Sequence, residues 1–163
     1  MQSFLWQQTR ELHHACEQHE VGSAMATGKP PMQWYADWMF ALLTIHKEVD
    51  KYYPVAIHRV DKLLEDLKNL SPNEINAAKE YAATLNSEKN IAGAAYVLTG
   101  AHLMGGAVMK KRLIDYPTKH LEWDNRKIAL KELEKLRQRE DVVEEAKQCF
   151  FALLQIMDEI RGK

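Results

Sequence analysis

Hydrophobic residues recur at helical spacing along most of the chain. Between about residues 3 and 19, one helical face collects apolar and weakly polar side chains: Leu5, Trp6, Thr9, Leu12, His13 and Cys16. The same period predicts further helices over about 32–52, 55–69, 72–86, 90–113, 127–139 and 142–161, whereas the alternation typical of strands is scarce. The pattern predicts an all-α fold, a compact multi-helix bundle that forms a single domain over residues 1–163.

Turn signals fall between these segments. The stretch 21–31 contains Gly22, Gly28, Pro30 and Pro31, which predicts a turn region after the first helix. The run from Ser71 to Glu74 predicts a helix start, because Ser71 can cap the helix and proline follows in the first turn.

The segment from about 90 to 113 is crowded with small residues. A glycine inside a helix costs about 1 kcal/mol relative to alanine, so several of them need a reason. At helical spacing one face would hold Ala95, Leu98, His102, Gly105, Gly106 and Met109. A flat, wide ligand could lie against this nearly bare backbone beside one imidazole, because glycine allows close approach. A tight helix–helix crossing, in which small residues simply allow close contact, explains the same residues and is the interpretation that spacing alone favours.

Composition and charge narrow the class of protein. The chain has 163 residues, with 22 Lys and Arg against 23 Asp and Glu, which is ordinary for one soluble globular domain. Near-neutral charge argues against nucleic acid or an anionic membrane as a partner. No apolar run approaches the roughly 20 residues that span a bilayer, and no secretory signal is visible. Two distant cysteines, Cys16 and Cys149, indicate a reducing compartment, so we expect a cytoplasmic protein.

Familiar catalytic motifs are absent from the sequence. It contains no H-E-x-x-H, no nucleophile elbow, no P-loop and no dinucleotide fingerprint. The Glu-x-x-His pairs of a carboxylate-bridged di-iron bundle are also missing. Seven histidines are present as candidate ligands.

Among the histidines, His13 is the first candidate ligand. A histidine on an apolar helix face is more often a core residue than a ligand. Glu17, however, lies four residues on and could hold the second ring nitrogen, as a metal-bound imidazole requires. His14 points about 100° away and is the weaker candidate. We expect His46 and His120 at the surface or at helix ends.

Five stretches of the chain, in order, resemble the heme oxygenase family. The first is Thr9-Arg10-Glu11-Leu12-His13, in which a threonine precedes the family's proximal histidine by four residues. The others are Cys16-Glu17, then Tyr53-Pro54 with Ile57-His58-Arg59 and Leu64-Glu65-Asp66-Leu67, then Ala95-Tyr96 with Gly105-Gly106, and last the run from Val142 to Phe150. Each is weak alone, but their order on an all-helical chain is fairly specific.

The resemblance implies a helical fold that clamps heme, as both cofactor and substrate, between a proximal and a distal helix. O2 and electrons from a donor such as ferredoxin or a flavin reductase would open the ring to biliverdin, CO and iron. His13 would be the proximal iron ligand, with Thr9 and Glu17 beside it in the heme-binding site. Gly105 and Gly106 would form the distal backbone against the heme face.

The distal motif departs from the family pattern. Gly-Asp-Leu-Ser-Gly-Gly aligns with Ala101 to Gly106, so His102 stands at the catalytic aspartate and Met104, a heme contact, at the serine. A shift of one residue would instead place Gly100 at the first glycine and Ala101 at the aspartate, and the acid is missing in either alignment. An imidazole at this position could hydrogen-bond distal water or ligate iron itself. The family's basic propionate contact falls near Trp6, which carries no charge, and a second contact could be Arg126.

Three functions remain open at this point. Heme oxygenase is the first. The second is a non-enzymatic heme- or bilin-binding protein, such as a sensor, carrier or store, which the missing aspartate favours. The third, a non-heme iron oxidase or a thiamin-salvage-like hydrolase on the same scaffold, is disfavoured because few inward carboxylates accompany the histidines.

Overall fold

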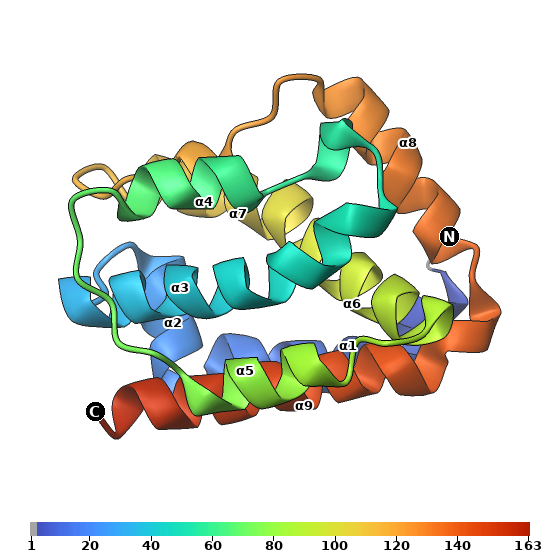
Figure 1. Ribbon diagram of the computed structural model, residues 1–163, viewed down its shortest axis with the longest axis horizontal. Helices are drawn as coiled ribbons and strands as arrows, with labels where there is room; N and C mark the ends of the chain where they lie inside the picture. The colour runs from blue at the N-terminus through green and yellow to red at the C-terminus, as the bar shows by residue number, and fades with distance from the viewer. Residues whose placement is uncertain (1–2) are drawn as a thin grey trace.

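The computed structural model describes residues 3–163, and these residues form helices and loops with no strand (Figure 1). The helices are α1 (Phe4–Gln18), α2 (Glu20–Thr27), α3 (Met32–Val49), α4 (Val60–Leu67), α5 (Asn76–Ala83), α6 (Glu88–Gly100), α7 (Gly106–Arg112), α8 (Arg126–Arg137) and α9 (Val143–Arg161). A π-helical segment, η3 (Ala101–Gly105), joins α6 to α7. The predicted all-α fold is confirmed.

Helix ends follow from local side-chain chemistry. The Ser3 and Ser87 hydroxyls accept hydrogen bonds from the Trp6 and Asn90 amides and so cap α1 and α6. Gly28 ends α2 in the left-handed region with a φ of 78°, where a side chain would be strained. These caps satisfy backbone groups that helix termini leave unpaired.

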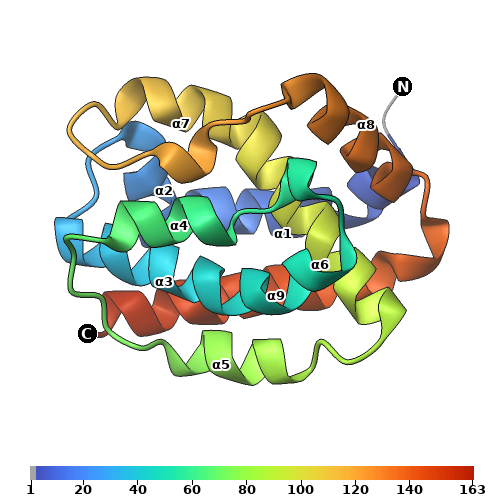
Figure 2. The same cartoon turned by 45° about the horizontal axis from the view of Figure 1, so that its top comes forward.

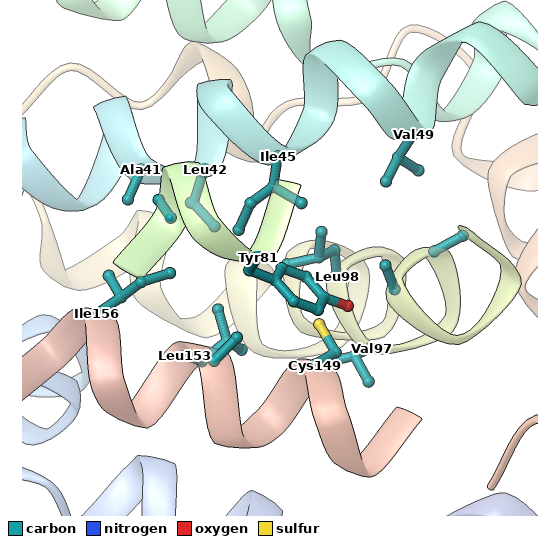
Figure 3. Packing of buried hydrophobic residues seen from close by; sticks show 14 of the residues in the cluster. Ala41, Leu42, Ile45, Val49, Tyr81, Val97, Leu98, Cys149, Leu153 and Ile156 are labelled. Carbon is teal, nitrogen blue, oxygen red and sulfur yellow. The ribbon is translucent and has the colours of Figure 1, made fainter. Parts of the chain in front are cut away.

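Helix α9 runs along the length of the molecule and packs against α1, α5 and α6 (Figures 1 and 2). Its buried face meets side chains from α3, α5 and α6 in one continuous core. Figure 3 shows this packing for ten labelled residues: Ala41, Leu42, Ile45, Val49, Tyr81, Val97, Leu98, Cys149, Leu153 and Ile156. The core fixes α6 on α9, and η3 continues from the end of α6.

The predicted turn region at 21–31 is wrong, because α2 occupies most of it. Gly22 lies inside that helix, where a Cβ atom would come within 2.0 Å of the Cys16 carbonyl oxygen. The glycine therefore serves a close contact with the end of α1 and does not break the helix.

Two other helix boundaries differ from the prediction. A 3-10 turn, η2 (Val55–Ile57), precedes α4, and α5 begins at Asn76 and not near Ser71. The first amides of α5 donate to the Glu159 carboxylate of α9, at 2.7 Å from Asn76 N and 2.9 Å from Ala77 N. A tertiary contact thus supplies the cap that local sequence was expected to provide.

The combined run Glu88–Arg112 is long and apolar enough to cross a membrane, with a mean hydropathy of 1.4. This corrects the expectation that no apolar run approaches that length. Of its apolar window, 67% is buried inside the fold, as in the core helix of a globular protein.

Gly93 marks the closest approach of α6 to α9. A Cβ atom at this position would lie 2.6 Å from Glu145 Cβ and 2.8 Å from Ala146 N. Gly93→Ala is therefore expected to lower the free energy of unfolding by about 1 to 3 kcal/mol through overpacking, measured by urea denaturation. Gly100→Ala is the control, since its Cβ would meet only Leu133 Cδ1 at 3.9 Å. Equal effects of the two substitutions would contradict the close approach.

Candidate functional site

His13 lies half-exposed on α1, between aromatic neighbours. Its ring makes edge-on contacts with Trp6, at 5.1 Å between ring centroids, and with Phe150 of α9, at 6.1 Å. Nδ1 lies 2.7 Å from Glu17 Oε1, although the carboxylate is poorly aligned for a hydrogen bond. Because Nδ1 is buried and turned toward Glu17, Nε2 is the ring nitrogen left for a ligand.

The electrostatics around His13 favour the neutral ring. Burial lowers the pKa of His13, the Glu17 carboxylate raises it in part, and His14 lowers it again. A neutral imidazole is the form that binds a metal. Thr9 lies one turn earlier, buried, and its hydroxyl donates to the Leu5 carbonyl at 2.7 Å.

The π-helical segment η3 separates residues that a regular helix would place on one face. Ala101, Met104 and Gly105 are exposed, and a Cβ atom on Gly105 would meet nothing within 4 Å. Gly106 is buried, with Leu121 Cδ2 at 3.0 Å from the position of its Cβ. The tight-packing explanation therefore accounts for Gly106, whereas Gly105 faces open space. π-Helical turns of this kind occur often at functional sites.

His102 turns into the core and meets two other buried histidines. Its Nε2 lies 3.3 Å from His46 Nε2, and its ring stands edge-on to His120 at 5.9 Å between centroids. The expectation that His46 and His120 lie at the surface is wrong, because each is 1% exposed. His46 falls between Leu42 and Val49 on the apolar stripe of α3, a signal that could have placed it inside.

A carboxylate anchors each outer histidine. Asp50 Oδ1 lies 2.9 Å from His46 Nδ1, and Asp66 Oδ2 lies 2.6 Å from His120 Nδ1. Burial holds the pKa of His102 well below its usual range, and neighbouring positive or protonatable groups lower it further. The central ring is therefore neutral, and it lies between two ring–carboxylate pairs. We call these five residues the histidine cluster.

A cavity of about 670 Å³ opens between the N-terminal end of α1, α6 and the end of α8. It is lined by Ser3, Phe4, Trp6, Tyr96, Glu134, Arg137, Gln138 and Glu140. Burial raises the pKa of Tyr96, while the hydroxyls of Thr9 and Ser3 partly offset that rise. Trp6 lines this cavity, and so does Arg137, a cation that the sequence interpretation did not name.

Arg126 lies at the other end of α8 from this cavity. Its guanidinium donates to the Leu103 carbonyl of η3 at 3.2 Å, and so pairs a carbonyl in the π-helical segment. The cation at the cavity is instead Arg137, whose guanidinium lies 3.4 Å from the Glu134 carboxylate, and the Glu140 carboxylate also lines the cavity. Spacing alone could not show that Arg137, at the opposite end of α8 from Arg126, is the cation that lines the cavity.

Solved structures with the same architecture identify the fold. A heme oxygenase from Leptospira interrogans superposes with a TM-score of 0.79 at 19% identity, covering 95% of this chain and 97% of its own. Heme oxygenase-1 from the cyanobacterium Synechocystis sp. PCC6803, solved in complex with heme, gives a TM-score of 0.81 at 16% identity, covering 97% and 90%. The chain has the heme oxygenase fold. Neither a protein-family model nor a curated protein matches its sequence.

The heme oxygenase fold confirms the resemblance read from five short stretches. In this fold α1 carries His13, and the junction of α6 and α7 carries Gly105. At 16–19% identity the likeness is one of architecture, so the chemistry rests on the residues of this chain.

Proposed function

We propose that this protein is a heme oxygenase, which opens heme to biliverdin, CO and iron. The observation that carries the proposal is His13, a half-exposed imidazole whose Nδ1 is held against Glu17 while Nε2 is left open. It stands on the first helix of a heme oxygenase fold. Neutral imidazole with an oriented second nitrogen is the usual donor for heme iron.

The residues around the site suit heme. The cavity of about 670 Å³ lies in the range of ligand pockets. Its hydroxyl groups and the Arg137 guanidinium could receive the propionates if Arg137 turned from its partner Glu134, and Trp6 offers an apolar edge. Bound heme would supply the iron that reduces O2 and the ring that is opened, with electrons from a donor such as ferredoxin or a flavin reductase.

Each residue of the proposed heme site would have a separate role. His13 would hold the iron through Nε2, and Glu17 would fix the ring orientation. Gly105 would let the backbone lie flat on the opposite heme face, since it has no side chain to keep the ligand away. His102 would present a neutral imidazole behind that wall, in place of the family's aspartate.

A non-enzymatic heme- or bilin-binding protein is the second candidate. It is favoured by His102, because an imidazole engaged with His46 replaces the carboxylate expected at this position. A sensor, carrier or store would need the same His13 and the same cavity. The two candidates differ only in whether bound heme is consumed.

Heme titration followed by reduction in air separates these candidates. Both predict a Soret band on addition of hemin. With ascorbate or a reductase, O2 and catalase, an oxygenase bleaches that band and releases biliverdin and CO. A Soret band that persists through repeated reduction would support the binding protein, and no Soret band at all would exclude both.

Arg137→Ala is expected to weaken heme affinity about fivefold, since one partly exposed ion pair contributes about 1 kcal/mol. Heme titration of the variant measures this loss. Arg126→Ala is the matched control on the same helix and should leave the affinity unchanged, because that guanidinium serves the Leu103 carbonyl. A larger loss of heme affinity in Arg126→Ala than in Arg137→Ala would indicate that Arg126 is the propionate contact.

A further inference from the structure

A hydrogen bond between two buried histidines joins the π-helical segment η3 to α3. His102 is the polar side chain of η3 that turns inward, and its Nε2 lies 3.3 Å from Nε2 of His46. Leu103, the other inward side chain of this segment, packs by shape, because burial of apolar surface has no preferred direction. A hydrogen bond does have one, so the ring pair is the inward contact that can fix how η3 is turned against α3.

The carboxylate of Asp50 sets which nitrogen of His46 faces His102. Asp50 Oδ2 accepts hydrogen bonds from the Arg59 and Val60 amides at 2.8 and 3.0 Å, and Oδ1 lies 2.9 Å from His46 Nδ1. An ionised carboxylate only accepts, so His46 Nδ1 carries a proton and donates it to this bond. Two lone pairs cannot face each other at 3.3 Å, so one proton also lies between the two Nε2 atoms, whichever ring supplies it.

These hydrogen bonds run from the start of α4 through Asp50 and His46 to His102. The three side chains are 8%, 1% and 5% exposed, so a bond lost here leaves a polar group unpaired in the core. His120 packs edge-on against the same His102 ring, at 5.9 Å between centroids. A buried hydrogen-bonded network of this kind specifies one arrangement of the elements that it joins.

A second hydrogen bond reaches η3 from the surface. The exposed Arg126 guanidinium donates to the Leu103 carbonyl at 3.2 Å. Water can replace a donor in such a position, so we expect this bond to contribute less to the position of η3 than the buried ring pair does. The contrast makes Arg126→Ala a comparison variant.

The segment η3 carries the backbone that is proposed to lie on the heme face. The Gly106 amide donates to the Ala101 carbonyl, five residues back, and closes the π turn that contains His102. Ala101 and Gly105 are exposed on this turn. We propose that His46 is a positioning residue, which acts through His102 to hold the π turn and with it the exposed backbone at Gly105. The inference rests on the proposed function only where it assigns that backbone to heme.

The wild-type protein without heme provides the first test. In the ¹³C,¹⁵N-labelled protein, NMR should show a proton on His46 Nδ1 and a scalar coupling between the facing Nε2 atoms of His46 and His102. A second coupling, between the Gly106 nitrogen and the Ala101 carbonyl carbon, should report the π turn. Absence of the ring-to-ring coupling would overturn the inference whether or not the protein acts on heme.

His46→Leu tests whether the ring pair holds the π turn. The substitution leaves His102 Nε2 without a partner in the core, so we expect the π-turn coupling to disappear. His46→Gln, which keeps a polar group toward His102, should retain the coupling. Val49→Ala is the control for stability, because it removes a different buried contact of α3 and leaves the ring pair in place. A coupling that persists in His46→Leu, or one that is lost in Arg126→Ala instead, would overturn the inference.

Heme titration tests the consequence for the site. Because the wall is displaced, His46→Leu should bind hemin about tenfold more weakly, which corresponds to the loss of one buried hydrogen bond. The iron–histidine stretching band should remain, since His13 on α1 is untouched, and Val49→Ala should keep the wild-type affinity. Unchanged affinity in His46→Leu would overturn the inference and leave the oxygenase intact. A wild type that gives no Soret band would refute the proposed function and leave the NMR result on η3 standing.

Discussion

His13→Ala is expected to abolish the axial imidazole ligation of heme. The ring is the one side chain on α1 that combines an open Nε2 with a buried Nδ1 facing a carboxylate, so no neighbour can replace it without moving the helix. Ferrous resonance Raman spectroscopy should lose the iron–histidine stretching band. Because the substitution leaves the cavity beside Trp6 and Arg137 unchanged, we expect hemin to bind more weakly but to remain associated.

His14→Ala provides the matched control. His14 is next in sequence and lies 3.9 Å from the same Glu17 carboxylate, but its side chain is 62% exposed. Its substitution should leave the iron–histidine band in place. Added imidazole should restore a five-coordinate ferrous spectrum in His13→Ala. If instead His14→Ala removes the band, the ligand has been assigned to the wrong residue.

Asp50→Ala is expected to lower the free energy of unfolding by about 3 to 5 kcal/mol at neutral pH, a large share of a typical domain's stability. The substitution leaves the amides of Arg59 and Val60 and the Nδ1 proton of His46 without their acceptor. Each unpaired buried donor costs about 1 to 3 kcal/mol. Urea denaturation monitored by circular dichroism measures the loss.

The pH dependence of this loss has a definite sign. Burial alone would raise the pKa of Asp50, but His46 and the two backbone amides outweigh it and lower the pKa below its ordinary value. The stabilisation is therefore present above the unfolded pKa of about 3.9 and is lost as pH falls through the folded value. The gap between wild type and Asp50→Ala should narrow in acid. Asp124→Ala, which removes an exposed partner of Lys62, should change stability and its pH dependence far less, because solvent screens that ion pair.

Much of the fold could be predicted because the apolar spacing of a helix is visible in its own stretch of sequence. The first, third, eighth and ninth helices begin and end close to where apolar spacing and caps place them. The position of Gly22 inside a helix and the residue that caps α5 could not be predicted from local spacing. The first reflects a contact with the Cys16 carbonyl, and the second is supplied by Glu159, more than eighty residues away. Both depend on tertiary approach, which local pattern does not encode.

In the candidate site, too, some contacts could be predicted from local sequence and others depend on tertiary structure. His13 with Glu17 could be found from sequence, since residues four apart share a helix face. The contact of His102 with His46 depends on how α3 crosses η3, and on a π-helical turn that shifts the faces of Gly105 and Gly106. The sequence also could not show which arginine lines the cavity. Arg126 and Arg137 lie at opposite ends of α8, and the choice between them depends on the direction of that helix.

A crystal structure of the protein with heme tests the central claim most directly. We expect the iron bound to Nε2 of His13, with Glu17 still against Nδ1 and the opposite face of the ring lying on the backbone of Ala101 and Gly105. A porphyrin held elsewhere, or iron bound by another residue while side chains fill the space beside Gly105, would contradict the account.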